Sequence, residues 1–231
     1  MINLPITPAR LQGGIFFKMY NLHEYQTKRE VEMKTVEQPL RHKKEYFDTV
    51  AQEWEANTPE QNREILQYTI DETTNDAPGK TVLDIGCGTG VSFPFLNGFD
   101  VIAFDLSSNM IEKAKMKTTS SLLTLLQADA HRIPLRNETI DSIICIAVYP
   151  HIIDKSLFLD ECYRVLRRDG TMGIIHLAPA DEINRLHMEA GGVVENDILP
   201  ETDEVVRQLE ATGFQPTHVE NDTFYFIAAQ K

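Results

Sequence analysis

Two kinds of hydrophobic spacing alternate along this 231-residue chain. Short, nearly continuous apolar runs predict buried strands, and apolar residues three or four positions apart predict helices. The predicted strands cover residues 82–85, 101–104, 122–126, 140–148, 172–177, 214–219 and 223–229. The predicted helices cover residues 41–57, 58–73, 91–96, 107–117, 155–166, 181–190 and 201–212.

Strands that alternate with helices favour parallel pairing through right-handed crossovers. The run from Ile140 to Val148 is almost continuously apolar, as expected of a central strand that is buried on both faces. Only Glu220-Asn221-Asp222 separates the last two strands, so they form a hairpin and add one antiparallel strand. We therefore predict an α/β fold, built on a doubly wound, mostly parallel sheet.

The first 40 residues show no sustained hydrophobic period and include Pro5, Pro8 and Gly13-Gly14. We expect residues 1–40 to be a poorly ordered N-terminal extension ahead of one domain over residues 41–231. The chain has no apolar run long enough to span a membrane and no signal-peptide layout, which predicts a cytoplasmic protein without a membrane partner.

Acidic residues outnumber basic ones by 35 to 22, which gives a formal net charge of −13. A surface of this charge repels a phosphate backbone, so a nucleic-acid partner is disfavoured. Cys87, Cys145 and Cys162 form no C-x-x-C pair, which argues against a zinc knuckle or a disulfide framework. For the assembly we expect a monomer or a homodimer.

A glycine turn follows the first strand, with Gly86, Gly88 and Gly90 in a G-x-G-x-G spacing. This spacing differs from the G-x-G-x-x-G of a dinucleotide-binding loop. The free N–H groups of a helix after the turn would suit a polar ligand. Asp84 at the end of the strand would repel a pyrophosphate but suit a ligand with an ammonium group. Cys87 either lines this ligand loop or is a small residue tolerated between glycines.

The segment Val82–Gly90 resembles motif I of the class I S-adenosylmethionine (SAM) dependent methyltransferases. The resemblance extends over roughly residues 43–231 and implies a Rossmann-like, seven-stranded sheet with SAM as the cofactor. The segment Ala147–Asp154 lacks the Asn/Asp-Pro-Pro-Tyr pattern of enzymes that methylate the amino groups of DNA bases and glutamine amides. It is similar to the "hHhxD" segment of small-molecule methyltransferases related to the ubiquinone/menaquinone biosynthesis group (methyltransferase domain 11-like).

In an open parallel sheet, a ligand lies beyond the carboxyl ends of the strands. Asp105 ends the second strand, where it either accepts the ribose hydroxyls or caps the next helix. The resemblance implies that Asp129 binds the adenine amino group and that Ala130 supplies a backbone amide. Leu106 would lie against the adenine ring, or else be ordinary core. Ala147 at the end of the fourth strand should approach the methionine part of the cofactor through its backbone.

The resemblance places His151 at the acceptor pocket, where an imidazole can act as a general base. A structural histidine bonded to a loop carbonyl is an equal alternative. Tyr149 is a second catalytic candidate, and packing is its alternative. His176, His187 and Asp197 could join His151 in a metal or substrate site, since His and carboxylate groups suit divalent ions. They lack a tight spacing such as H-x-x-x-H, so we predict no metal site and keep this as the alternative.

Two further segments are candidates for covering the site. Residues 47–54 follow an "FDxxAxxW" pattern, similar to the helix that covers the cofactor in some methyltransferases. Packing on the domain is the alternative reading. Residues 181–200 should form either an apolar acceptor wall or a covered sheet edge, through Met188, Val193, Val194, Ile198 and Leu199.

Together these features predict an enzyme that transfers a methyl group from SAM to a small-molecule acceptor by in-line displacement, giving S-adenosylhomocysteine. One alternative is a methyltransferase acting on protein or RNA, which would need a basic or extended docking surface. Another is a SAM-binding protein without methyl transfer. A nucleotide-dependent oxidoreductase is disfavoured by the spacing of the glycines and by Asp84.

Overall fold

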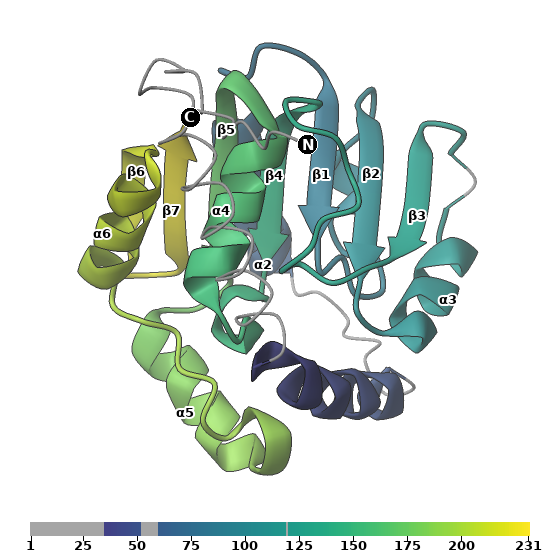
Figure 1. The fold of residues 1–231 in the computed structure, drawn as a ribbon, viewed down its shortest axis with the longest axis vertical. Coiled ribbons are helices and arrows are strands. Elements are labelled where there is room, and N and C mark those ends of the chain that lie inside the picture. The colour runs from purple at the N-terminus through teal and green to yellow at the C-terminus, as the bar shows by residue number, and fades with distance from the viewer. Residues whose placement is uncertain (1–34, 52–59, 119) are drawn as a thin grey trace, which may run out of the picture.

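The computed structural model describes residues 35–51, 60–118 and 120–231, and its centre is a seven-stranded sheet (Figure 1). The strand order is β3-β2-β1-β4-β5-β7-β6. The strands are β1 (Thr81–Ile85), β2 (Asp100–Asp105), β3 (Leu123–Gln127), β4 (Ile140–Ile146), β5 (Leu166–His176), β6 (Gln215–Glu220) and β7 (Tyr225–Gln230). Pairing is parallel from β3 to β5, while β7 is antiparallel to both of its neighbours. The predicted α/β fold is confirmed.

Helices cover both faces of the sheet. They are α2 (Glu60–Thr74), α3 (Ser108–Met116), α4 (Lys155–Val165), α5 (Ala180–Ala190) and α6 (Thr202–Thr212). Leu66 and Ile70 of α2 and Ile111 of α3 belong to one buried cluster. Phe158 of α4 and Leu209 of α6 belong to the other. Apolar residues of β4 are buried in both clusters, which explains the continuous hydrophobicity of its sequence.

A further helix, described as helical over residues 35–50, is called here the N-terminal helix. It lies with α5 beyond the carboxyl ends of the parallel strands, at the bottom of Figure 1. The expected helix over 41–57 therefore includes residues 35–40, and Val36 is buried. Trp54 lies outside the described residues. No helix in the described parts of the chain is long and apolar enough to cross a membrane.

The expected helix over residues 91–96 is wrong. The glycine loop leads instead into a short 3-10 turn, η1, over Phe93–Phe95. An α-helix there would need the residue at position 94 to donate its N–H to the carbonyl of Gly90, and Pro94 has no N–H. The 3-10 turn closes instead through a hydrogen bond between residues three positions apart, from Leu96 N to Phe93 O at 3.2 Å. A turn at Gly98 follows it.

The fifth strand begins earlier than predicted, because Leu166–Gly170 belongs to β5 and does not close a helix. Leu166 pairs with Ile140, and a register shift between Ile140 and Ser142 accommodates the extra residues. Asp169 takes a positive φ of 61° within this irregularity. Asp141 lies beneath it as a buried structural carboxylate, accepting hydrogen bonds from Thr81 N at 2.9 Å and Arg167 Nη1 at 2.6 Å.

Candidate functional site

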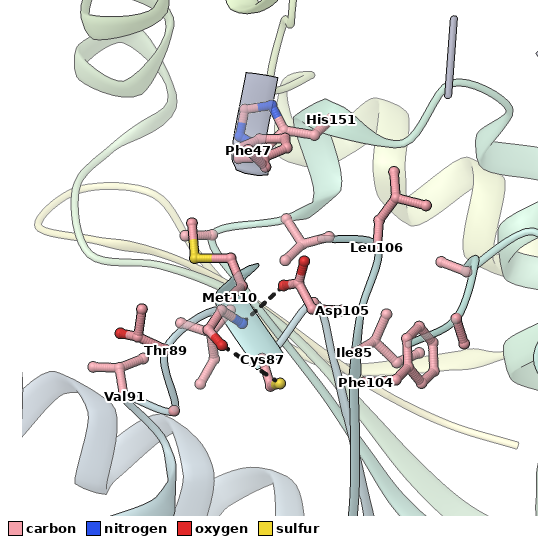
Figure 2. A pocket seen from close by; sticks show the side chains of 18 of the residues that line it. Phe47, Ile85, Cys87, Thr89, Val91, Phe104, Asp105, Leu106, Met110 and His151 are labelled. Carbon is pink, nitrogen blue, oxygen red and sulfur yellow. Dashed lines mark hydrogen bonds between the residues drawn. The ribbon is translucent and has the colours of Figure 1, made fainter. Parts of the chain in front are cut away.

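A cavity of about 450 Å³ lies at the carboxyl ends of the central strands. The predicted site residues in its wall are Gly86, Cys87, Gly88, Gly90, Asp105, Leu106, Asp129, Ala130, Ala147 and His151. The N-terminal helix adds Phe47 to the same wall, as Figure 2 shows. The elements that end at this edge of the sheet thus bring together most of the residues that sequence reasoning selected.

The glycine loop forms the floor of the cavity through its backbone. Gly86 and Gly88 have positive φ angles of 66° and 52°, and a tight turn closes through Gly90 N and Cys87 O at 2.9 Å. A Cβ on Gly86 would lie 2.3 Å from a methyl group of Val148. Only glycine allows this close approach of β1 to the end of β4. Burial raises the pKa of the Cys87 thiol, so this residue stays protonated.

Asp84 lies behind the loop and does not line the cavity. Its side chain is 1% exposed, and its carboxyl group accepts a hydrogen bond from Ser92 Oγ. Burial raises the pKa of Asp84 to about 7, partly opposed by the Ser92 hydrogen bond. The structure thus shows Asp84 bracing the glycine loop from beneath, whereas we expected it to face the ligand directly.

Asp105 ends β2 and connects two elements of the cavity wall. One carboxylate oxygen accepts from Gly88 N at 2.9 Å (Figure 2), and the other accepts from Ser107 N at 2.8 Å. The helix cap that we considered as its alternative role belongs to Ser107, whose Oγ accepts from Met110 N. Asp105 is half-buried at the cavity, with lone pairs left for further donors.

The wall beyond β3 is built around Asp129. Its Oδ1 accepts from His131 N at 3.0 Å and lies 2.7 Å from His131 Nδ1. His131 Nε2 accepts from Asp154 N at 3.2 Å, so the ring proton is on Nδ1 and points to Asp129. These bonds fix Asp129 by one oxygen and leave the other for a donor. Leu106 and Ala130 flank it in the cavity wall.

Ala147 and Tyr149 follow β4 but point to different places. Ala147 has a positive φ of 56°, is exposed to the cavity, and is anchored through its N–H to Ile175 O at 2.8 Å. Tyr149 is fully buried and does not line the cavity. Its hydroxyl donates to Gln208 Oε1 at 2.6 Å, and burial raises its pKa. The structure assigns Tyr149 to packing, the alternative reading of its sequence position.

His151 lines the cavity beside Phe47 of the N-terminal helix (Figure 2). The two ring centroids are 5.1 Å apart. His151 Nδ1 lies 2.6 Å from Asp197 Oδ2, and the His187 ring lies 4.8 Å from the His151 ring. Burial lowers the pKa of His151, although Asp197 opposes this shift, so the imidazole is neutral near pH 7.

The remaining candidates for the acceptor side are arranged differently from our expectation. None of the five apolar residues of the 181–200 segment lines the cavity: Val194 and Leu199 are buried, and Met188, Val193 and Ile198 are exposed. His176 ends β5 in a fully buried position, where its Nε2 has no hydrogen-bond partner among the described residues. No group of three or more His, Cys, Asp or Glu side chains in the described ranges is arranged to hold a metal ion.

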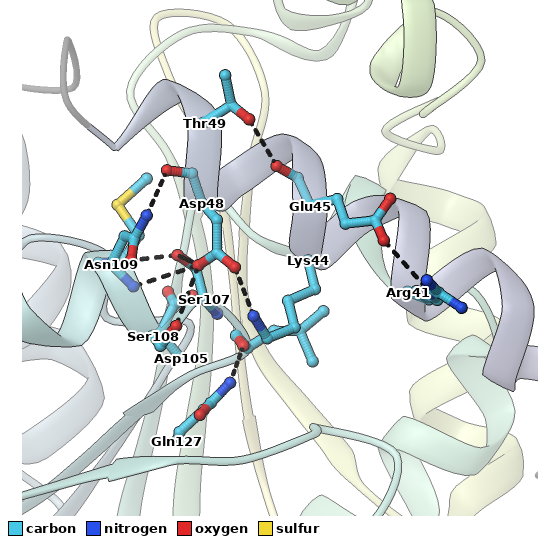
Figure 3. Close-up of polar contacts among 12 residues, drawn as sticks. Arg41, Lys44, Glu45, Asp48, Thr49, Asp105, Ser107, Ser108, Asn109 and Gln127 are labelled. Carbon is cyan, nitrogen blue, oxygen red and sulfur yellow. Dashed lines mark hydrogen bonds and ion pairs between the residues drawn. The ribbon is translucent and has the colours of Figure 1, made fainter.

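The N-terminal helix covers the cavity and is held at two points. Asp48 Oδ1 accepts from Ser107 Oγ at 2.6 Å and from Asn109 N at 3.2 Å, which fixes the helix to the start of α3 (Figure 3). The second point is Lys43, which donates to Asp197 and to Val193 O in the segment that follows α5. Phe47 lies in the cavity wall, as the covering role suggested by the sequence requires, and that role stays a prediction.

Three basic residues of the cavity wall, Lys43, Arg63 and Lys117, escaped sequence reasoning. Lys117 Nζ donates to Thr89 Oγ1 at 3.0 Å, next to the glycine loop. Arg63 lies over the Phe95 ring, 5.5 Å from its centroid. Lys43 and Arg63 lie on separate helices and Lys117 follows the end of α3, and no local pattern distinguishes them from ordinary surface residues. Lys43 is paired with Asp197, whereas the ammonium group of Lys117 next to the glycine loop favours a ligand with an anionic group there.

These residues fit SAM on three structural grounds. The backbone of the glycine loop forms the cavity floor, and it requires glycine at position 86 because there is no room for a Cβ. Asp105 and Asp129 line the cavity, and their carboxylate oxygens suit hydroxyl and amino donors. Basic side chains near the glycine loop suit a carboxylate, so the donor and acceptor set matches a zwitterionic nucleoside ligand better than a pyrophosphate.

Comparison with known proteins agrees with this geometry. Residues 83–174 match the model of a family described as a methyltransferase domain. The ubiquinone/menaquinone biosynthesis C-methyltransferase UbiE of Haemophilus ducreyi is 25% identical over 196 residues, which cover 71% of this chain and 75% of that protein. The uncharacterized protein MJ1252 of Methanocaldococcus jannaschii is 32% identical over 132 residues, which cover 55% of this chain and 48% of that protein.

A crystal structure of a SAM-dependent methyltransferase from Aquifex aeolicus has a TM-score of 0.62 at 20% identity, covering 79% of this chain and 96% of that chain. The match covers 48% of the length of MJ1252, and the match to a second uncharacterized protein of the same organism, MJ0638, covers 39% of the length of that protein. The domain match, the sheet and these relatives together support a class I SAM-dependent methyltransferase with SAM as its cofactor.

Proposed function

We propose that this protein methylates a small-molecule acceptor. The observation that carries the proposal is the cavity, which runs from the ends of β2 and β3, past the glycine loop, to His151 beneath the N-terminal helix. Its one end offers groups for a nucleoside, and its other end offers a neutral imidazole.

The cofactor would be held by residues of three strand ends. Asp105 would accept from the ribose hydroxyls, and the free oxygen of Asp129 would accept from the adenine amino group, between Leu106 and Ala130. The backbone at Ala147 and the glycine loop would surround the amino-acid part. Arg63 and Lys117 would face its carboxylate.

When bound, SAM supplies a sulfonium methyl group that passes in line to the acceptor, the carbon–sulfur electron pair stays on sulfur, and S-adenosylhomocysteine results. The chain's own contribution is to orient the acceptor, exclude water and take up a proton. Phe47 and the N-terminal helix would close the cavity against water. His151 Nε2 would take the proton of an acceptor that loses one, because Nδ1 is committed to Asp197.

A small acceptor is favoured by the shape and charge of the site. The cavity of about 450 Å³ lies within the usual range for small-molecule pockets. The N-terminal helix covers it, and a macromolecular acceptor would have to displace that helix. The net charge of −13 also disfavours RNA. We also propose that the enzyme is cytoplasmic and has no nucleic-acid partner, and both statements are supported only by the hydropathy and the net charge of the sequence.

The proposal is tested with SAM carrying a labelled methyl group and extracts separated by size into small molecules, RNA and protein. We expect the label in a low-molecular-mass product, with a mass increase of one methyl group per acceptor. Label in RNA or protein would replace the small-molecule assignment. A protein that binds SAM tightly but transfers no label to any fraction would instead be a SAM-binding protein.

A further inference from the structure

The carboxylate of Asp197 is shared between two residues from distant parts of the chain. Its Oδ2 lies 2.6 Å from His151 Nδ1 and also accepts from Lys43 Nζ. Lys43 donates in addition to Val193 O at 3.1 Å. The three side chains are nearly enclosed, with exposures of 13% for His151, 12% for Asp197 and 9% for Lys43. Such a buried cluster is costly to assemble unless every charge has a partner.

The hydrogen bonds define where the proton of His151 lies. Burial would raise the pKa of Asp197, but the hydrogen bonds from His151 and Lys43 outweigh it and lower the pKa. An ionised carboxylate only accepts hydrogen bonds, so Nδ1 of His151 carries the proton. The neutral ring then has its lone pair on Nε2, the nitrogen left for the acceptor.

Charged and titratable groups approach His151 from several elements. Lys43 comes from the N-terminal helix, His187 from α5, and Asp197 from the loop after η3 (Gly192–Val194). His187 Nδ1 lies 2.6 Å from the carbonyl of Asp197, so it does not compete for the carboxylate. Farther groups are His176 at the end of β5, Lys155 on α4 and Glu204 on α6. Among these groups, Asp197 raises the pKa of His151, whereas Lys43 and His187 lower it.

Lys43 also belongs to the helix that closes the cavity. Lys43 and Phe47 are four residues apart, on one face of the N-terminal helix, and both line the cavity. The same helix is fixed to α3 through Asp48 (Figure 3). When this helix packs over the cavity, it therefore places the Lys43 ammonium group at Asp197 and the Phe47 ring at His151 together.

We propose that Asp197 and Lys43 are positioning residues that fix His151 with its proton on Nδ1 and its Nε2 toward the acceptor. The inference rests on the proposed methyl transfer for the use of Nε2. The acceptor class that needs this arrangement has a nucleophilic atom that loses a proton on methylation, such as a hydroxyl or a thiol. Its proton goes to Nε2 of His151, and the resulting imidazolium is stabilised by Asp197.

The test compares the variants Asp197→Asn and Lys43→Met in the full chain by NMR of ¹⁵N-labelled histidine, with the His151 signals assigned through His151→Gln. In the wild type we expect the Nδ1–H form and a pKa below the ordinary value. Asp197→Asn should lower the pKa of His151 further, because a stabilising negative charge is lost. Lys43→Met should raise it, because a repelling positive charge is lost. Glu195→Gln removes an exposed acidic group two residues before Asp197 and should change neither the tautomer nor the pKa of His151.

The kinetic arm uses the acceptor found with labelled SAM. Asp197→Asn should reduce kcat at least about tenfold, within the range for loss of an effective general base, with SAM affinity within twofold of wild type. The acid limb of the kcat profile should move to lower pH in Asp197→Asn and to higher pH in Lys43→Met, and Lys43→Arg should restore the wild-type limb.

Opposite shifts in the two variants support the positioning role, since a purely structural contact would move neither titration in this way. A wild-type His151 with its proton on Nε2, or a titration unchanged in Asp197→Asn, overturns the inference. If the NMR results hold but no acceptor is ever methylated, the proposed function fails and the positioning of His151 stands.

Discussion

Replacing Asp105 with Asn removes one charged acceptor at the junction of the glycine loop and α3. The wild-type carboxylate already accepts from Gly88 N and Ser107 N, at 2.9 and 2.8 Å. The ribose hydroxyls would be further donors to the same two oxygens. In Asp105→Asn, one oxygen becomes an NH₂ group that must face a donor, and the remaining oxygen loses its charge.

The size of the effect follows from these contacts. A hydrogen bond to a charged group contributes about 1.5–3 kcal/mol, and about 1.4 kcal/mol corresponds to a tenfold change in affinity. We therefore expect the Kd for SAM to rise by about 10- to 150-fold. The unfolding free energy should fall by about 1–3 kcal/mol, because a half-buried N–H loses its acceptor.

Calorimetric titration with SAM, below the onset of thermal unfolding, measures the affinity separately from the stability. Asp100→Asn is the matched control, since Asp100 is exposed at the other end of β2. This control should bind SAM like the wild type. A folded Asp105→Asn protein whose Kd stays within twofold of the wild type would refute the ribose assignment.

Three further variants, and one control for the first of them, test other parts of the account. Gly86→Ala places a Cβ 2.3 Å from Val148 at a φ of 66°, so SAM affinity should fall at least about tenfold and stability by about 2–4 kcal/mol. Gly98→Ala, at a φ of 87° with no neighbour within 4 Å, should lose only about 1 kcal/mol and keep full affinity. His151→Ala should reduce kcat about 100-fold or more at unchanged SAM affinity. His176→Leu should raise the unfolding free energy at pH 7.5 by about 1–3 kcal/mol, because an unpartnered buried nitrogen is removed.

The His176 variant also predicts a change in acid sensitivity. Burial lowers the pKa of His176 to about 3, with smaller contributions from His151 and His187. The unfolded chain takes up this proton near pH 6.5 while the folded chain does not, so wild-type stability is lost as the pH falls from about 6.5 toward 3. Urea unfolding at pH 7.5 and pH 5 should show a weaker pH dependence in His176→Leu. Loss of SAM affinity or an unchanged pH dependence would contradict this reasoning.

Local patterns were sufficient for most strand positions, for the closing hairpin and for the glycine turn. The apolar runs predict β1 and β4 through their burial, and the short loop before β7 predicts the hairpin through chain connectivity. The helix expected after the glycine loop failed, because one proline removes the hydrogen bond that would start it. The start of β5 was missed because an irregular pairing with β4 overrides the turn-like sequence Arg167–Gly170.

The cavity was harder to predict on its acceptor side. Asp105 and Asp129 are found from sequence because Asp105 is the last residue of β2 and Asp129 lies two residues after β3. Lys43 and Asp197 meet across 154 positions, and nothing near either residue signals the contact. Tyr149 was predicted as a candidate because it follows the fourth strand, but within the 3-10 turn Tyr149–His151 its side chain is buried while that of His151 lines the cavity. Such pairings depend on how helices seat on the sheet, which spacing alone does not encode.

The central claim is that SAM binds over the glycine loop between the ends of β1 and β2. The most direct measurement is a calorimetric titration of the purified protein with SAM, S-adenosylhomocysteine and NAD. We expect one site per chain for SAM and S-adenosylhomocysteine, strong weakening of both in Gly86→Ala, and no heat with NAD. Absence of binding to both SAM and S-adenosylhomocysteine, or uptake of NAD in their place, would contradict the account.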